Sequence, residues 1–213
     1  MGGSTMRIAG HFYSTEGEGQ KVGLPTFFLE FPGCTSKCPF CKFKSDGVVD
    51  MTQEQIVKLC DQYPTRHIYL DCGEPLLQGT KQIGDLLWGL VASGYEPTLQ
   101  TNGYTYIGPL FPVSTKVTIF LFVRPGVTDL TNINRLRAEH DQIKFVVTTM
   151  AEYLDAIEII KAHTPTVPVF IFPHPKYKNE TELFTQFTLD YHKHSALSNT
   201  RMCLLEHLYA GVK

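Results

Sequence analysis

The sequence predicts an α/β fold: a partial, open βα barrel with about six mainly parallel strands. Apolar runs alternate along the chain with segments of helical spacing, which is typical of βα units around a parallel sheet. Segments rich in cysteine or glycine directly follow several of these runs, where such sheets gather their functional groups. Six strands are too few for a closed eight-stranded barrel.

The first half of the chain is expected to supply three strands and two helices. Strands are predicted at 25–31, 67–71 and 97–100, and helices at 52–61 and 81–92. Thr52-Gln53-Glu54-Gln55 has the pattern of a capping box that opens the first helix. Ser93-Gly94 ends the second helix.

The second half repeats the alternation. Strands are predicted at 117–123, 143–148 and 167–172, helices at 129–139 and 151–163, and a closing helix or helical turn at 201–209. No internal repeat or low-complexity linker is visible, so residues 6–213 are expected to form a single domain. Residues 1–5 resemble an expression scar and are set aside.

Composition narrows the class of protein. The chain is 43% hydrophobic and 19% charged with a formal net charge of -2, so there is no overall basic surface and nucleic acid is not expected as a partner. No apolar run approaches the ~20 residues that span a bilayer, and the N-terminus lacks the regions of a signal peptide. A cytoplasmic location without membrane attachment is therefore expected.

Three cysteines, Cys34, Cys38 and Cys41, have the spacing C-x₃-C-x₂-C. Three thiolates on one short loop can hold three corners of a 4Fe–4S cluster and leave one iron open to bind a substrate or cofactor. A structural zinc site normally has four ligands, and no secretion signal supports a disulfide framework. The alternative from another class is a non-enzymatic iron–sulfur or zinc module.

The cysteine loop, followed by Gly73-Glu74-Pro75, resembles the radical S-adenosylmethionine (radical SAM) superfamily. Within it, the chain is similar to the 7-carboxy-7-deazaguanine synthases. The segments that carry this resemblance are 12–19, 22–25, 27–34, 73–78, 101–103, 144–147 and, near the end, Arg201, His207 and 211–212. It implies ring contraction of 6-carboxytetrahydropterin to 7-carboxy-7-deazaguanine with loss of ammonia. It also implies a partial barrel of the radical SAM type, a 4Fe–4S cluster, S-adenosylmethionine, a reductant such as flavodoxin or ferredoxin, and a homodimer.

The resemblance also implies roles for individual residues. Cys34, Cys38 and Cys41 are expected to ligate the cluster, and Gly73, Glu74, Asn102 and Phe40 to bind S-adenosylmethionine. Glu16, Glu18 and Lys42 are the candidate catalytic residues, with both carboxylates accepting hydrogen bonds from a nitrogen-rich heterocycle. The ammonium of Lys42 can take the place of a cation, which leaves dependence on Mg²⁺ open.

Several positions depart from the family pattern. Lys42 and Phe43 replace an expected Asp-Thr pair, whose hydroxyl helps hold magnesium. Leu24 and Glu30 stand where arginines are expected, Gln100 where Glu is, Leu205 where Gln is, and Cys72 where Gly is. Without those arginines a substrate carboxylate loses its expected partners. Two alternatives follow: an enzyme on the same scaffold that acts on another small molecule or nucleobase, or an activating enzyme that installs a glycyl radical.

Overall fold

The protein is described by a computed structural model that covers residues 5–39, 41, 43, 47–111, 114–175 and 179–205. Its main feature is an eight-stranded sheet in the order β10-β9-β8-β7-β6-β5-β3-β2. The strands are β2 (Gly10–Thr15), β3 (Pro25–Glu30), β5 (His67–Asp71), β6 (Glu96–Thr101), β7 (Thr118–Phe122), β8 (Gln142–Val147), β9 (Val169–Pro173) and β10 (Thr200–Met202). Neighbouring strands are parallel except β2 and β3, which are antiparallel. β1 (Thr5–Ile8) and β4 (Val49–Thr52) form a separate antiparallel pair.

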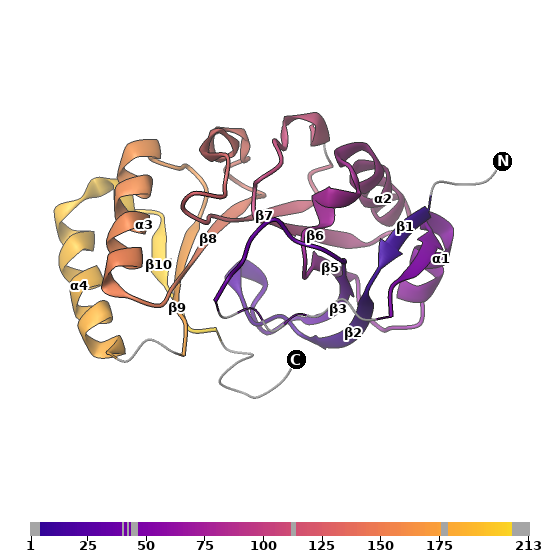
Figure 1. The fold of residues 1–213 in the computed structure, drawn as a ribbon, viewed down its shortest axis with the longest axis horizontal. Coiled ribbons are helices and arrows are strands. Elements are labelled where there is room, and N and C mark those ends of the chain that lie inside the picture. The colour runs from indigo at the N-terminus through magenta and orange to yellow at the C-terminus, as the bar shows by residue number, and fades with distance from the viewer. Residues whose placement is uncertain are drawn as a thin grey trace.

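Helices cover the outer side of the curved sheet (Figure 1). They are α1 (Gln53–Cys60), α2 (Thr80–Ala92), α3 (Met150–His163) and α4 (Glu180–Lys193). Short 3-10 helices are η1 (Gly19–Lys21), η2 (Pro75–Gln78), η3 (Gly108–Leu110), η4 (Leu130–Arg135) and η5 (Ser195–Leu197). None of the helices in the described part of the chain is both long and apolar enough to cross a membrane.

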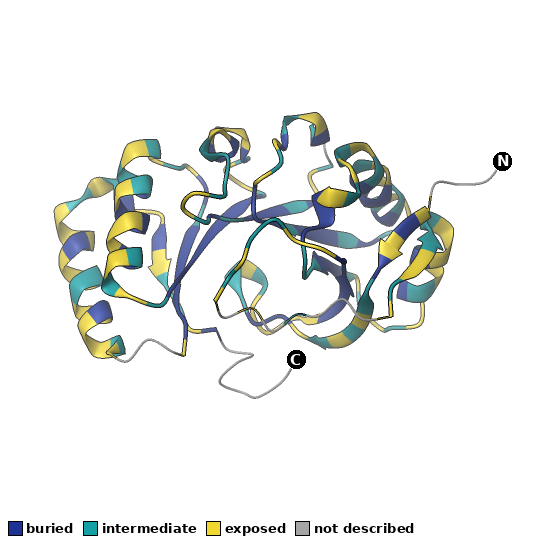
Figure 2. Ribbon diagram, viewed as in Figure 1, coloured by how far each residue is buried: buried dark blue, intermediate teal, exposed yellow. Residues whose placement is uncertain are grey.

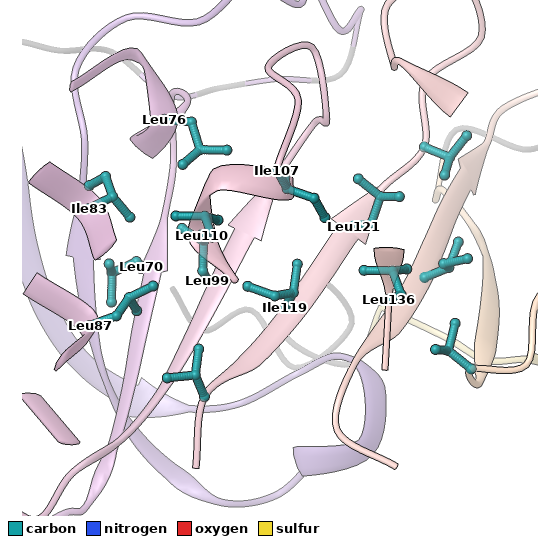
Figure 3. Packing of buried hydrophobic residues seen from close by; sticks show 14 of the residues in the cluster. Leu70, Leu76, Ile83, Leu87, Leu99, Ile107, Leu110, Ile119, Leu121 and Leu136 are labelled. Carbon is teal, nitrogen blue, oxygen red and sulfur yellow. The ribbon is translucent and has the colours of Figure 1, made fainter. Parts of the chain in front are cut away.

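Alternation along the strands divides the buried side chains into two clusters. Leu70, Leu99 and Ile119 point outward and belong to one cluster with Ile83 and Leu87 of α2 and Leu110 of η3 (Figure 3). Their strand neighbours point inward and form a second, aromatic cluster that includes Phe28, Tyr69, Phe120, Phe170 and Phe172. Figure 2 shows the result: the strands are mostly buried, while the helices expose one face. Both faces of the parallel strands are therefore covered, as this architecture requires.

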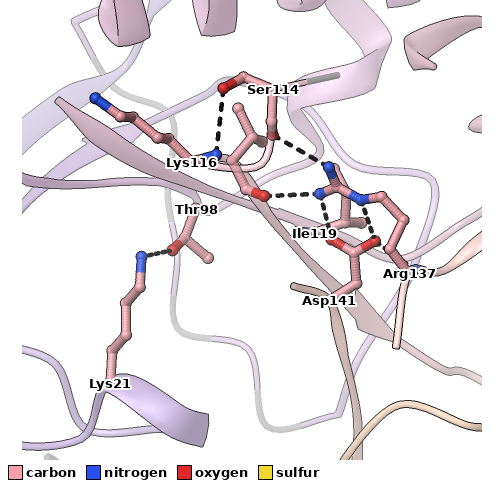
Figure 4. Close-up of polar contacts among 8 residues, drawn as sticks. Lys21, Thr98, Ser114, Lys116, Ile119, Arg137 and Asp141 are labelled. Atoms are coloured by element: carbon pink, nitrogen blue, oxygen red, sulfur yellow. Dashed lines mark hydrogen bonds and ion pairs between the residues drawn. The ribbon is translucent and has the colours of Figure 1, made fainter. Parts of the chain in front are cut away.

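One buried polar cluster ties β7 to the segments around it (Figure 4). Asp141, fully buried, accepts a hydrogen bond from the backbone N–H of Ile119 at 2.8 Å and pairs with the Arg137 guanidinium, also at 2.8 Å. The guanidinium donates in turn to the carbonyls of Ser114 and Val117 at 3.1 and 2.7 Å. The same view shows the Lys21 ammonium donating to Thr98 Oγ1, 3.3 Å away, on the inner side of β6.

The six predicted strands are confirmed, and the sheet gains β2 and β10 at its edges. The predicted helix at 129–139 is wrong: the structure has only the 3-10 helix η4, because the buried amide of Asn132 bonds to the carbonyls of Gly103 and Thr105. The predicted closing helix at 201–209 is also wrong where it is described, since Arg201 and Met202 belong to β10. Thr5, set aside with residues 1–4, is the first residue of β1.

Candidate active site

A cavity of about 750 Å³ lies where the parallel strands end. The cysteine loop after β3, Gly73 after β5 and Asn102 after β6 all contribute to its wall. Carboxyl ends of parallel strands share one edge of the sheet, so segments distant in sequence meet there. The cavity therefore joins the motifs that the sequence singled out.

Cys34, Cys38 and Cys41 all line this cavity. Ser36 organises the loop, because its backbone N–H donates to Cys34 Sγ and its hydroxyl lies against Cys38 Sγ, both at 3.3 Å. Cys34 and Cys41 are exposed and Cys38 is half-buried, and none of the three is in a disulfide. Burial raises the pKa of the Cys34 thiol, and the hydrogen bond from the Ser36 backbone offsets part of that rise.

The three thiols supply the donor set of an iron–sulfur cluster. Among the described residues, no three His, Cys, Asp or Glu side chains converge closely enough to hold one metal ion. In a cubane each cysteine binds a different iron, so its thiolates face one cavity without converging on a point. Three accessible thiols along one cavity wall provide that donor set.

Gly73 occupies a position where only glycine fits. Its φ is +58°, and a Cβ there would overlap the carbonyl oxygens of Phe31 and Gly33. Glycine thus lets the end of β5 approach the cysteine loop closely. Both residues beside this contact, Gly33 and Gly73, line the cavity.

Glu74 is almost completely buried, and protein groups occupy both of its oxygens. Oε1 accepts from the Thr101 hydroxyl at 2.7 Å and from the Leu76 N–H at 3.1 Å, while Oε2 accepts from the Asn102 N–H at 2.7 Å. Burial raises the pKa of this carboxyl, and the Asn102 and Thr101 hydrogen bonds counteract the rise. The contacts of Glu74 join the ends of β5 and β6.

Asn102 links the strand edge to the cysteine loop. Its amide donates to Thr35 Oγ1 at 3.0 Å and to Cys34 Sγ at 3.6 Å. Its Oδ1 accepts from the Tyr104 N–H at 3.0 Å. Asn102 therefore holds the first cysteine in place from the end of the neighbouring strand.

Glu18 and Lys144 form an ion pair at the cavity, with side chains only 13% and 6% exposed. The ammonium also lies 4.9 Å from the ring centroid of Phe122 and 5.5 Å from that of Phe120. Glu18 comes from the loop before η1, which is fastened to β8 by a 2.9 Å hydrogen bond from the Gln20 N–H to Gln142 Oε1. The two partners therefore come from segments that are themselves joined.

Glu16 is buried next to Glu18 and is not among the described residues that line the cavity. Its Oε1 accepts from the Glu18 N–H at 3.1 Å, and its buried Oε2 has no hydrogen-bond partner. Burial, and then the charges of Glu18 and Asp71, raise the pKa of Glu16 to about 8. The carboxyl is therefore mostly protonated at neutral pH.

A hydrogen-bonded chain of three side chains crosses the inner face of β5 and β6. The Tyr69 hydroxyl donates to Gln100 Oε1 at 3.1 Å, and the Gln100 amide donates to Asp71 Oδ1. Burial raises the pKa of Asp71, and the Lys144 charge counteracts the rise. Asp71 and Gln100 line the cavity.

Beside them, Cys72 adopts a φ of +53°, which is uncommon for a residue other than glycine. Its Sγ lies 3.7 Å from Oε1 of Glu30, a buried carboxylate. Leu24 stays exposed on the surface, whereas Phe43 and Leu205 line the cavity. Of the positions that depart from the family pattern, Phe43, Cys72, Gln100 and Leu205 line the cavity with neutral side chains, and the Glu30 carboxylate contacts the wall through Cys72.

The structure brings together most of the residues singled out from the sequence. The three cysteines, Glu18, Gly73 and Asn102 share one cavity. Phe40 and Lys42 lie outside the described residues, as does His207. Asp71 and His174 line the cavity although no sequence motif marked either as functional, and Lys144 entered only as part of a matched segment.

Several curated proteins that are similar to the chain share one description. The chain is 30% identical over 175 residues to the 7-carboxy-7-deazaguanine synthase of Methanospirillum hungatei, covering 80% of this chain and 73% of that protein. It is 29% identical to the 7-carboxy-7-deazaguanine synthase of Koribacter versatilis, covering 74% and 72%. No family model matches the chain.

Solved structures show the same fold. QueE from Escherichia coli superposes with a TM-score of 0.71 at 18% identity, covering 94% of this chain and 93% of that one. SuiB from Streptococcus suis, bound to S-adenosylmethionine, gives a TM-score of 0.55 at 14% identity, covering 83% of this chain and 48% of SuiB. At these identities the structural likeness concerns the fold.

Proposed function

Because the chain belongs to the 7-carboxy-7-deazaguanine synthase family of radical SAM enzymes, we propose that it contracts 6-carboxy-5,6,7,8-tetrahydropterin to 7-carboxy-7-deazaguanine with release of ammonia. The reaction makes it a carbon–nitrogen lyase that works in the biosynthesis of 7-deazapurines. One observation carries the proposal: the three thiols, Gly73, Asn102 and Glu18 line a single cavity at the carboxyl edge of the sheet.

The cysteines are the ligands proposed for a 4Fe–4S cluster. When bound, the cluster and S-adenosylmethionine supply the electron and the radical chemistry that remove hydrogen from the substrate. Asn102 orients Cys34 through the contacts described above. Gly73 keeps the strand edge open beside the cluster loop, where a larger side chain would collide with backbone carbonyls. Glu74 holds the ends of β5 and β6 together through its hydrogen bonds to Thr101 and Asn102.

Glu18, Asp71 and Gln100 are proposed to bind the heterocycle. A pterin presents a row of N–H donors on its pyrimidine ring, and two carboxylates with an amide oxygen form an acceptor surface for it. Phe122, Val146 and Leu205 supply the apolar part of the same wall, against which a flat ring can pack. Glu16, which is protonated and accepts a hydrogen bond from the Glu18 N–H, adds no further negative charge to these two carboxylates.

Three further features remain predictions. The electron donor is a low-potential protein such as flavodoxin or ferredoxin, and the enzyme is a homodimer. Whether the reaction needs Mg²⁺ depends on whether the ammonium of Lys42 takes the place of that cation, and Lys42 lies outside the described residues.

A second candidate is a reaction on another heterocycle with the same scaffold. The observation that favours it is Glu30, a buried carboxylate in contact with Cys72 of the cavity wall, where the family resemblance leads one to expect an arginine. A carboxylate there repels a substrate anion instead of binding it.

The test is reconstitution with iron and sulfide in the absence of oxygen, followed by S-adenosylmethionine, reductant and 6-carboxytetrahydropterin, with and without Mg²⁺. Mass spectrometry should show 7-carboxy-7-deazaguanine, and Cys38→Ser should abolish it. Deoxyadenosine without pterin conversion would point to the second candidate. Zinc in place of iron and sulfide would mean that the chain is not a radical enzyme.

A further inference from the structure

The charges around the cavity are distributed unevenly. Glu18 and Asp71 contribute carboxylates to the wall, and Glu30 contacts the wall through Cys72. Among the described residues that line the cavity, Lys144 is the one lysine or arginine. A substrate that carries a carboxylate would be repelled by most of this surface and attracted at Lys144.

The surroundings of Lys144 keep its ammonium in a fixed position at the cavity, where it can bind such an anion. Its side chain is 6% exposed, so its ammonium has little water to solvate it and is paired with Glu18. Phe120 and Phe122 flank it at 5.5 and 4.9 Å from their ring centroids, which stabilises a cation at this position independently of Glu18. Lys144 and Phe122 are partners in the β7–β8 register, so the arrangement is fixed by the sheet.

We propose that Lys144 binds the substrate carboxylate, and that Glu18 occupies the position of that carboxylate until the substrate enters. The inference rests on the proposed function, because that function supplies a substrate with a carboxylate and a row of N–H donors. On binding, the substrate carboxylate replaces Glu18 on the ammonium, and Glu18 accepts hydrogen bonds from the heterocycle. Neither buried charge is left without a partner at the end of the exchange.

The energetics favour replacement of Glu18 by the substrate carboxylate over binding of the substrate beside an intact Glu18–Lys144 pair. Separating a buried ion pair and leaving either charge alone is strongly unfavourable. A ligand that lacks the carboxylate would either leave the Glu18–Lys144 pair intact, and so lose Glu18 as an acceptor, or break it without compensation. The pair therefore selects for ligands that carry both an anion and donors.

The experiment measures binding of 6-carboxypterin and of pterin without the carboxylate, through pterin fluorescence, to the cluster-reconstituted protein. These oxidised, stable analogues separate recognition from turnover. Wild type should prefer the carboxylated analogue by about 10- to 100-fold, the value of one charge-assisted hydrogen bond. Lys144→Met should lose that preference while binding pterin within a few-fold of wild type, and Lys144→Arg should keep part of it.

Two controls accompany the test. Lys81→Met removes a lysine whose side chain is 86% exposed on α2 and should leave the preference unchanged. The double variant Glu18→Gln with Lys144→Met removes both charges, so that it folds without an unpaired buried carboxylate and should likewise show no preference.

A preference that survives Lys144→Met, or that wild type never shows, would overturn the proposal. The proposed function is tested separately by product formation. If the wild type makes no 7-carboxy-7-deazaguanine but still prefers the carboxylated analogue through Lys144, the proposed reaction is wrong and the anion site at Lys144 stands.

Discussion

At the scale of single residues, Glu16 makes stability depend on pH. Burial and the neighbouring carboxylates raise its pKa from 4.5 to about 8. Between these values the unfolded chain releases the proton while the folded protein keeps it, so stability falls as pH rises through this window and levels off above pH 8. Glu16→Gln removes the ionisation and should exceed wild type in thermal stability by a margin that grows across the window to several degrees. A margin that does not change between pH 5 and 9 would contradict the assignment.

A second residue-scale prediction concerns Gly73. Gly73→Ala should destabilise the fold more than Gly94→Ala, although both glycines have positive φ, +58° and +89°. At Gly94 a Cβ would meet no atom within 4 Å, so the cost there is the backbone conformation alone, about 1–2 kcal/mol. At Gly73 the overlap with the Phe31 and Gly33 carbonyls should add at least about 1 kcal/mol. Urea unfolding of the two variants gives the comparison, and equal losses would show that the strand edge can move away.

At the scale of elements, Asp141 holds β7 to its surroundings. Asp141→Ala leaves the Arg137 guanidinium and the Ile119 N–H without their carboxylate, which should cost about 3–5 kcal/mol in the free energy of unfolding. The matched control is Lys81→Ala, which breaks an exposed ion pair with Asp85 and should cost about 0–1 kcal/mol. Denaturant titration measures both, and similar losses would mean that the buried cluster adds nothing beyond a surface pair.

Elements with clear local signals were predictable from sequence. The strand at 67–71 matches β5, and Thr52 and Gln55 make the expected capping box at α1. α4 was missed because its buried side chains include Asp190, which accepts from the Tyr153 hydroxyl at 2.8 Å and breaks the apolar pattern. In η4 the tertiary bonds of Asn132 outweigh local helical spacing.

At the scale of the whole molecule, part of the site could be predicted because strand ends meet at one edge. That rule places the cysteine loop, Gly73 and Asn102 together without further information. It does not say which inward side chains face the cavity. In β8 the run Gln142-Ile143-Lys144-Phe145 alternates polar and apolar residues and puts Lys144 on one face with Gln142, but this pattern does not say that the face lines a cavity, and in the structure all six residues of the strand are buried. The role of Lys144 emerges only when the curvature of the sheet brings it to Glu18.

The architecture also predicts how the molecule responds to loss of its cluster. Both buried clusters of hydrophobic side chains lie within the sheet and its helices, and neither includes Cys34, Cys38 or Cys41. The fold therefore does not depend on the metal, unlike small zinc modules that unfold when the metal is removed. Oxidative removal of the cluster followed by chelation should leave the far-ultraviolet circular dichroism unchanged and unfolding cooperative. The free energy of unfolding should fall only by the binding free energy that the cluster contributes, and the melting temperature should fall correspondingly. Collapse of the secondary structure on removal would show that the cysteine loop organises the fold, and would favour a structural metal module over the enzyme proposed here.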